Sequence, residues 1–149
     1  MIQKRSNIAE YILYLWQMED YLRAFPQHAE ATQELHDLNE MMHQENIVEH
    51  GHLQLAQNAL SEMEDIHRDL LSEEATYRAA MLRLTPALNI LKSKTDRPEM
   101  SDVEACLLLL YQIMLLRLQK RAITPDTESV QKQATEVLRY LSRTYRDQK

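Results

Sequence analysis

The sequence is poor in the residues that punctuate turns, since its 149 residues include one glycine and four prolines. A chain with so little glycine and proline has few tight turns. Leucine, alanine, glutamate, glutamine and methionine are plentiful, and these residues favour helices. Because no strand pattern, internal repeat or low-complexity segment is present, the sequence predicts helices joined by short polar connections.

The chain also has a single cysteine, Cys106, which excludes an internal disulfide framework and a cysteine-based zinc site. Cys106 lies in the most apolar run, ACLLLLYQIMLLRL (105–118), which contains Gln112 and Arg117. A membrane span needs about 20 apolar residues, so this run predicts a buried core helix with an inert thiol. No small-residue cleavage site follows the opening MIQKRSN, so we expect no signal peptide, and we expect a cytoplasmic protein that does not contact a membrane.

Charge is unevenly distributed along the chain, whose formal net charge is −6. Residues 10–74 carry a net charge of −13, whereas residues 75–149 carry +5. The two segments can pair within one chain or between copies, which favours a homo-oligomer or an unknown protein partner. The acidic balance disfavours nucleic acid, and we interpret the basic C-terminal residues as a solvated helix face (Arg139, Arg143, Arg146 and Lys149).

Apolar periodicity predicts an all-α, single-domain bundle of about six helices that covers residues 1–149. Capping patterns begin three of these helices at Asn7, Ser101 and Thr124, while Pro86 should kink or split a fourth. The predicted helices cover residues 7–25, 28–45, 48–71, 74–94, 102–121 and 125–146. We expect the helices at 7–25 and 102–121 to be the most buried.

The only glycine, Gly51, is predicted to lie inside the third helix. From Val48 to Leu71 the apolar residues keep a helical phase, which a loop at Gly51 would reset. A glycine within a helix costs about 1 kcal/mol relative to alanine, so the missing Cβ would serve close packing of a neighbour. This interpretation places His52 at the centre of the apolar face.

Three stretches of the chain resemble a bacterial family catalogued as domain of unknown function 4924. They are SNIAEYILYLWQMEDYLRAF (6–25), GHLQLAQN (51–58) and LYQIMLLRLQKRAITPDT (110–127). The family is associated with Bacteroidetes, and the resemblance covers nearly the whole chain. It implies a small cytosolic helical protein, but it brings no activity, ligand or catalytic residue.

Two polar residues, Glu19 and His52, fall at the centres of apolar helix faces and form the main candidate site. A buried polar side chain must find a hydrogen-bond partner, so we expect both residues to be mostly buried and partnered, with each other as one option. Trp16 and Glu49, each one helical turn from one of them, complete this candidate ligand site. The alternative is purely structural, with Glu19 paired to Arg23 or to a tyrosine hydroxyl.

Other chemistry finds less support in the residues. His36, Glu40 and His43 share one helix face with metal-ligand spacing, but that face points to solvent, so we predict no physiological metal or other cofactor. A di-iron bundle needs two inward ExxH pairs, and only Glu49 with His52 is suitably placed. Catalytic motifs such as HExxH, GxSxG and a glycine-rich phosphate loop are absent from the sequence.

The sequence therefore leaves two functions open. The first is a non-enzymatic helical binding or interaction module, which forms a homo-oligomer or binds another protein. The second is a small enzyme or ligand-binding protein with an internal polar pocket near Glu19 and His52. A cavity lined by Trp16, Glu19, His52 and a tyrosine would favour the second.

Overall fold

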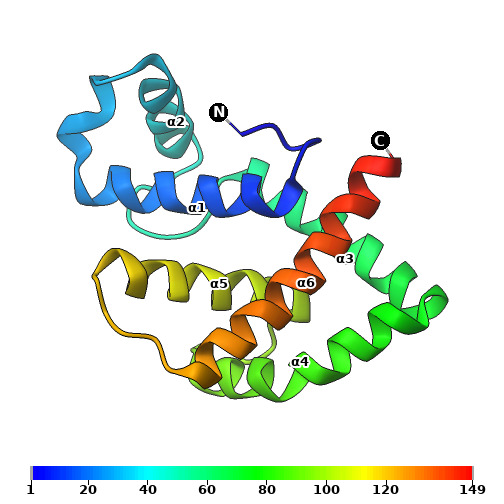
Figure 1. Ribbon diagram of the computed structural model, residues 1–149. Helices are drawn as coiled ribbons and strands as arrows, with labels where there is room; N and C mark the ends of the chain where they lie inside the picture. Colours follow the sequence, from blue (N-terminus) through cyan, green and yellow to red (C-terminus); the bar gives the residue numbers. More distant parts are fainter. Residues whose placement is uncertain (1, 149) are drawn as a thin grey trace. The chain divides into compact units, whose positions relative to one another are not determined.

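The computed structural model describes residues 2–148, and these residues form only helices and connecting segments (Figure 1). The all-α prediction is confirmed. The elements are α1 (Ile8–Ala24), the 3₁₀ helix η1 (Pro26–Glu30), α2 (Gln33–Gln44), α3 (Gln54–Glu73), α4 (Ala75–Ser93), α5 (Asp102–Leu118) and α6 (Pro125–Gln148). The chain divides into two compact units, which meet within α3 between Glu62 and Met63. We describe each unit by itself.

The first unit contains α1, η1, α2 and the beginning of α3. Asn7 caps α1 as predicted, because its side chain accepts a hydrogen bond from the Glu10 N–H at 3.1 Å. Pro26 follows the end of α1, and α2 packs against α1 and η1. The core of this unit contains apolar side chains from both helices (Ile8, Ile12, Leu15, Leu22, Leu38 and Met42).

The helix predicted at 28–45 is shorter than expected at its start. Thr32 is the N-cap of α2, since its hydroxyl accepts a hydrogen bond from the Leu35 N–H, and the preceding residues form η1 instead. A threonine side chain that caps a helix competes with helical continuation through it. Asn46, directly after the C-cap of α2, has a φ of 57°, and this left-handed conformation ends the helix.

The helix predicted at 48–71 is wrong at its beginning, because α3 starts only at Gln54. Residues 45–53 form a loop, in which Gly51 has a φ of +97°, a conformation that side chains rarely adopt. Val48 shares the apolar phase of α3 but is 39% exposed, so its place in that phase is coincidental. Gly51 thus serves to turn the chain rather than to allow close helix packing.

The second unit contains the rest of α3 and the helices α4, α5 and α6, each of which packs against the other two. Ser101 and Thr124 cap α5 and α6 as predicted, through bonds from Glu104 N–H and Thr127 N–H, both 3.1 Å long. α4 runs through Pro86 without being split. Six apolar residues that recur at helical spacing along α4 are all buried (Tyr77, Ala80, Met81, Leu84, Leu88 and Leu91).

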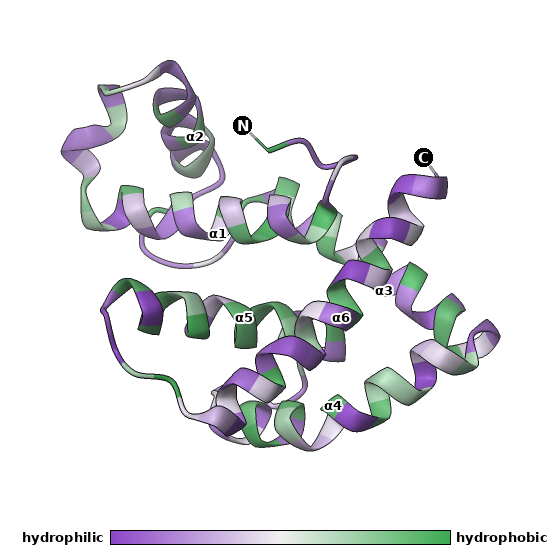
Figure 2. Ribbon diagram, in the orientation of Figure 1, coloured by the Kyte–Doolittle hydropathy of each residue, from purple (hydrophilic) through white to green (hydrophobic). Residues whose placement is uncertain are grey.

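Polar contacts fix the connection between α4 and α5. The Arg97 guanidinium donates two hydrogen bonds to the Glu104 carboxylate, at 2.7 and 3.2 Å, and Lys92 pairs with Asp102 at 2.5 Å. In Figure 2 hydrophobic residues run along most of α5, whereas α6 alternates between hydrophilic and hydrophobic residues. An amphipathic helix such as α6 packs against the core with one face only.

Candidate functional site

Among the residues that the structure describes, Glu19 is the charged residue that is buried, with 1% of its surface exposed. It lies on the face of α1 that also carries Ile12, Leu15 and Trp16, all of which are buried. This confirms the predicted burial of Glu19. A carboxylate in such surroundings is stable only when hydrogen bonds replace the water that it loses.

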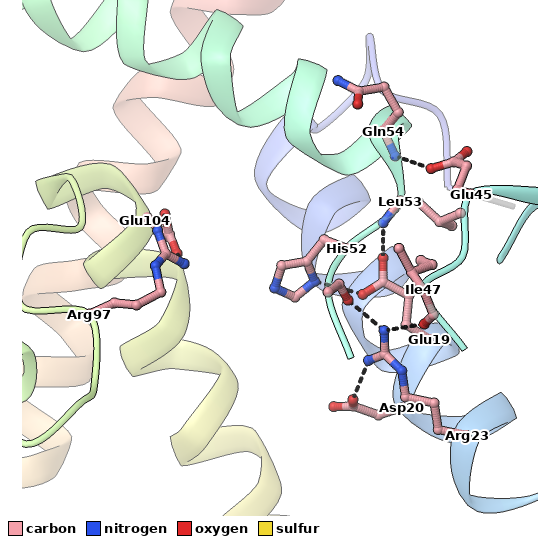
Figure 3. A network of polar contacts seen from close by, with 11 residues as sticks. Glu19, Asp20, Arg23, Glu45, Ile47, His52, Leu53, Gln54, Arg97 and Glu104 are labelled. Atoms are coloured by element: carbon pink, nitrogen blue, oxygen red, sulfur yellow. Dashed lines mark hydrogen bonds and ion pairs between the residues drawn. The ribbon is translucent and has the colours of Figure 1, made fainter. Parts of the chain in front are cut away.

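Both carboxylate oxygens of Glu19 have partners (Figure 3). Oε1 lies 2.7 Å from Nδ1 of His52, and Oε2 accepts a hydrogen bond from the Leu53 N–H at 2.8 Å. Because a carboxylate only accepts, Nδ1 of His52 carries the proton and donates. The predicted partnership of Glu19 with His52 is therefore confirmed.

His52 differs from its prediction in location. It belongs to the loop before α3 rather than to the centre of a helix face, and its side chain is 32% exposed. Its ring stacks on Trp16, with 4.9 Å between ring centroids and an angle of 25° between the planes. The predicted place of His52 at the centre of a helix face is wrong, because the chain forms no helix there, but most of the side chain is buried as expected.

Arg23 holds the same loop from its other side. One guanidinium nitrogen, Nη2, donates to the carbonyl oxygen of Ile47 at 2.9 Å and to that of Gly51. Nη1 donates to Asp20 at 3.3 Å. Arg23 thus binds the loop backbone. The pairing of Arg23 with Glu19, which the structural alternative proposed, is not formed.

The N-terminus of α3 receives its capping groups from other segments. Leu53 precedes the helix and has no capping side chain, but its N–H is bonded to Glu19, and the N–H of Gln54 donates to Oε1 of Glu45 at 2.8 Å. Carboxylates at a helix N-terminus satisfy unpaired N–H groups and interact favourably with the helix dipole. Glu19 and Glu45 together define the start of α3.

The chemical capacity of this site follows from the atoms that remain available. Glu19 uses both oxygens to hold His52 and the backbone of Leu53, so it has a positioning role. The partly exposed His52 ring can still offer Nε2 to a ligand. Glu49, predicted as part of the same site, is exposed in the loop and stands outside this network.

The predicted surface metal candidates are only partly brought together. His36 bonds to Glu30 through Nδ1 at 2.9 Å and pairs with Glu40 through Nε2 at 3.2 Å, while His43 stays exposed. The hydrogen bond to Glu30 raises the pKa of His36. Within residues 2–148, no group of three or more histidine, cysteine, aspartate or glutamate side chains is arranged to hold a metal ion.

The buried thiol and the basic C-terminal helix match their sequence-based interpretations as far as they are described. Burial raises the pKa of Cys106 to about 12, which keeps the thiol protonated. On α6, Arg143 lies over the Tyr140 ring, 5.2 Å from its centroid, and Arg146 pairs with Asp147 at 3.9 Å. Lys149 lies outside the described residues.

The sequence reasoning missed an apolar groove on the second unit. The groove has a volume of about 430 Å³ and is formed by α4, α5 and the beginning of α6. Its apolar lining consists of Ala87, Ile90, Leu91, Leu109, Ile113, Leu116 and Val130. α5 was expected to be among the most buried helices, but its buried residues end at Ile113. The apolar residues that follow Ile113 in α5 were the feature of the sequence that could have indicated a groove.

Comparisons with known proteins assign a family but no activity. No helix among the described residues is long and apolar enough to cross a membrane. No curated protein and no solved structure matches the chain. A family model described as Domain of unknown function (DUF4924) matches residues 2–149, and the chain belongs to this family.

Proposed function

We propose that this protein is a non-enzymatic helical interaction module that binds another protein chain in the apolar groove of its second unit. The observation that carries the proposal is the groove itself, whose lining is mostly apolar residues of three helices. Removing the apolar lining of such a groove from water favours the binding of a complementary apolar side chain.

Ile90 gives the groove its most accessible apolar contact. Its side chain is 57% exposed, while Leu91 and Ile113, which also line the groove, are buried. A large aliphatic residue beside a hollow provides both a projection and a recess for a partner, the arrangement found at the centre of protein interfaces. Burial of this surface by a partner would remove it from water.

Site-specific photo-crosslinking in the native cells tests this proposal. A photoreactive phenylalanine analogue at position 90 should yield a discrete protein adduct, and the added Leu116→Glu substitution should abolish it. The matched control places the analogue at Leu82, which is on the same helix and 72% exposed but outside the groove. Equal adducts from both positions, or none from position 90, would overturn the proposal.

The second candidate function is small-ligand binding at His52. It is favoured by the geometry of the ring, which Glu19 orients through Nδ1 and Trp16 supports by stacking. In the neutral ring Nε2 is an acceptor, so the fitting probes are small alcohols and amides. A change in the ¹⁵N resonance of His52 Nε2 with such compounds, lost in Glu19→Gln, would support this function, and an unchanged resonance would remove it.

A further inference from the structure

The groove carries one charge of each sign, on different helices. Lys94 is the C-cap of α4, Asp126 lies in the first turn of α6, and both residues line the groove. Both side chains are exposed, and neither forms an ion pair within the described chain. Each charge suits the dipole of its own helix end, but each remains available to a partner.

We infer that the occupant of the groove is the groove of a second copy of this chain, in a two-fold symmetric dimer; this inference rests on the proposed function. In such an interface every contact occurs twice, with residue i of one copy against residue j of the other. A rotation that brings the α4 side of one groove over the α6 side of its partner places Lys94 against Asp126, and does so a second time by symmetry. Opposite charges on the two sides make the surface complementary to itself.

The apolar residues fit the same arrangement. Ile90 is exposed at the groove of its own copy. In the two-fold dimer its side chain would enter the groove of the other copy. Leu118, which ends α5 and is also exposed, extends the apolar area beyond the groove. A stable dimer needs about 800 Å² from each copy, so the groove with its rim and this extension would have to be covered together.

Charge reversal with purified protein tests the symmetry directly. Lys94→Asp places two like-charge contacts in its own dimer, and Asp126→Lys does the same, so each variant alone should dimerise at least about tenfold more weakly in sedimentation equilibrium. A mixture of the two variants should regain the wild-type affinity, because both contacts in the mixed dimer then join opposite charges. Lys132→Asp, a reversal of an exposed lysine on α6 outside the groove, is the matched control and should leave the affinity unchanged.

The outcomes separate this inference from the proposed function. The two-fold dimer is overturned if neither charge reversal changes the dimerisation affinity. It is also overturned if the mixture of the two variants dimerises as weakly as each variant alone. A monomeric wild-type protein with a crosslinked adduct of a different protein at position 90 also overturns it, but leaves the interaction module in place. A monomeric protein with no adduct at position 90 overturns both.

Discussion

The two units of this protein use their polar and apolar side chains in different ways. Residues up to Glu62 carry 10 acidic and 3 basic side chains with five of the six histidines, whereas the rest of the chain is nearly balanced, with 13 acidic and 14 basic. In the first unit, charged side chains hold the backbone of the 45–53 loop and the start of α3. In the second unit, three helices share an apolar core and leave an apolar groove uncovered.

This difference separates a residue's burial from its function. Glu19 looks like a functional residue, because a buried carboxylate beside a histidine is a frequent catalytic arrangement. Its bonds, however, are to the 45–53 loop, which Arg23 also holds in place. The groove contains no unusual residue, yet its apolar side chains remain uncovered and are available to a partner. Function is therefore better sought in the plainer unit.

The largest effect on folding is expected from Glu19→Ala in the first unit. The change leaves His52 Nδ1 and the Leu53 N–H without their acceptor and should lower the free energy of unfolding by about 3 kcal/mol. Urea unfolding measures this change. Asp20→Ala is the matched control, because the Asp20 carboxylate follows Glu19 in the chain but is exposed. This change should cost less than about 0.5 kcal/mol.

A double-mutant cycle of Glu19→Gln and His52→Leu shows how much of that effect belongs to the pair. Two residues joined by a charged hydrogen bond should be coupled by about 1 kcal/mol, so the double variant should be more stable than the sum of the single changes implies. Additive changes would mean that the carboxylate acts through Leu53 alone.

Gly51→Ala should destabilise the first unit by about 1–2 kcal/mol, because alanine is strained at a φ of +97°. Space is not the cause, since an added Cβ would lie in ordinary contact with Ile47, at 3.4 Å. Thermal unfolding tests this, with Ala59→Gly in the middle of α3 as a helical counterpart. Stabilisation by Gly51→Ala would restore the interpretation of Gly51 as part of a helix.

A smaller effect, dependent on pH, is expected at His67 in the second unit. Nδ1 of His67 is hydrogen-bonded to the Tyr77 hydroxyl at 2.7 Å, and burial lowers the pKa of His67 despite the nearby Asp102 and Glu64 carboxylates. A histidine whose pKa is lowered by folding stabilises the protein fully above its ordinary value of about 6.5, and this contribution is lost as the pH falls below it. The stability difference between wild type and His67→Gln should therefore shrink between pH 7 and pH 5. A difference independent of pH would show that His67 is not buried as a neutral ring.

The smallest effect on folding is expected in the groove. Ile90→Lys should change the free energy of unfolding by less than about 0.5 kcal/mol, because the side chain is mostly exposed and a cation is favourable near the C-terminus of α4. Leu82→Lys on the same helix should behave alike in urea unfolding. A loss of more than about 1 kcal/mol in Ile90→Lys alone would mean that the groove belongs to the core.

Local features of this fold were predictable from the sequence, whereas long-range ones were not. The caps at Asn7, Ser101 and Thr124 depend on neighbouring residues, and the core face of α4 depends on periodicity alone. The start of α3 depends on carboxylates from distant segments, so no pattern around Gly51 could reveal it. Periodicity also cannot distinguish Val48, which shares the phase of the helix, from a residue within it.

The candidate site shows the same limit. The partnership of Glu19 and His52 was predictable because two buried polar groups need partners, but the exposure of His52 depended on the loop. The groove was not predictable, since the part of α5 that remains uncovered depends on how three helices meet. Unpartnered apolar surface is a property of tertiary packing, and only an excess of apolar residues in 105–118 pointed to it.

Sedimentation equilibrium of three variants tests the central claim, that the groove binds a partner while the Glu19–His52 pair only supports the fold. At tens of micromolar, we expect wild type, Leu82→Lys and His52→Leu to form dimers and Ile90→Lys to be monomeric. Dimerisation that survives Ile90→Lys but is lost in His52→Leu would contradict the account.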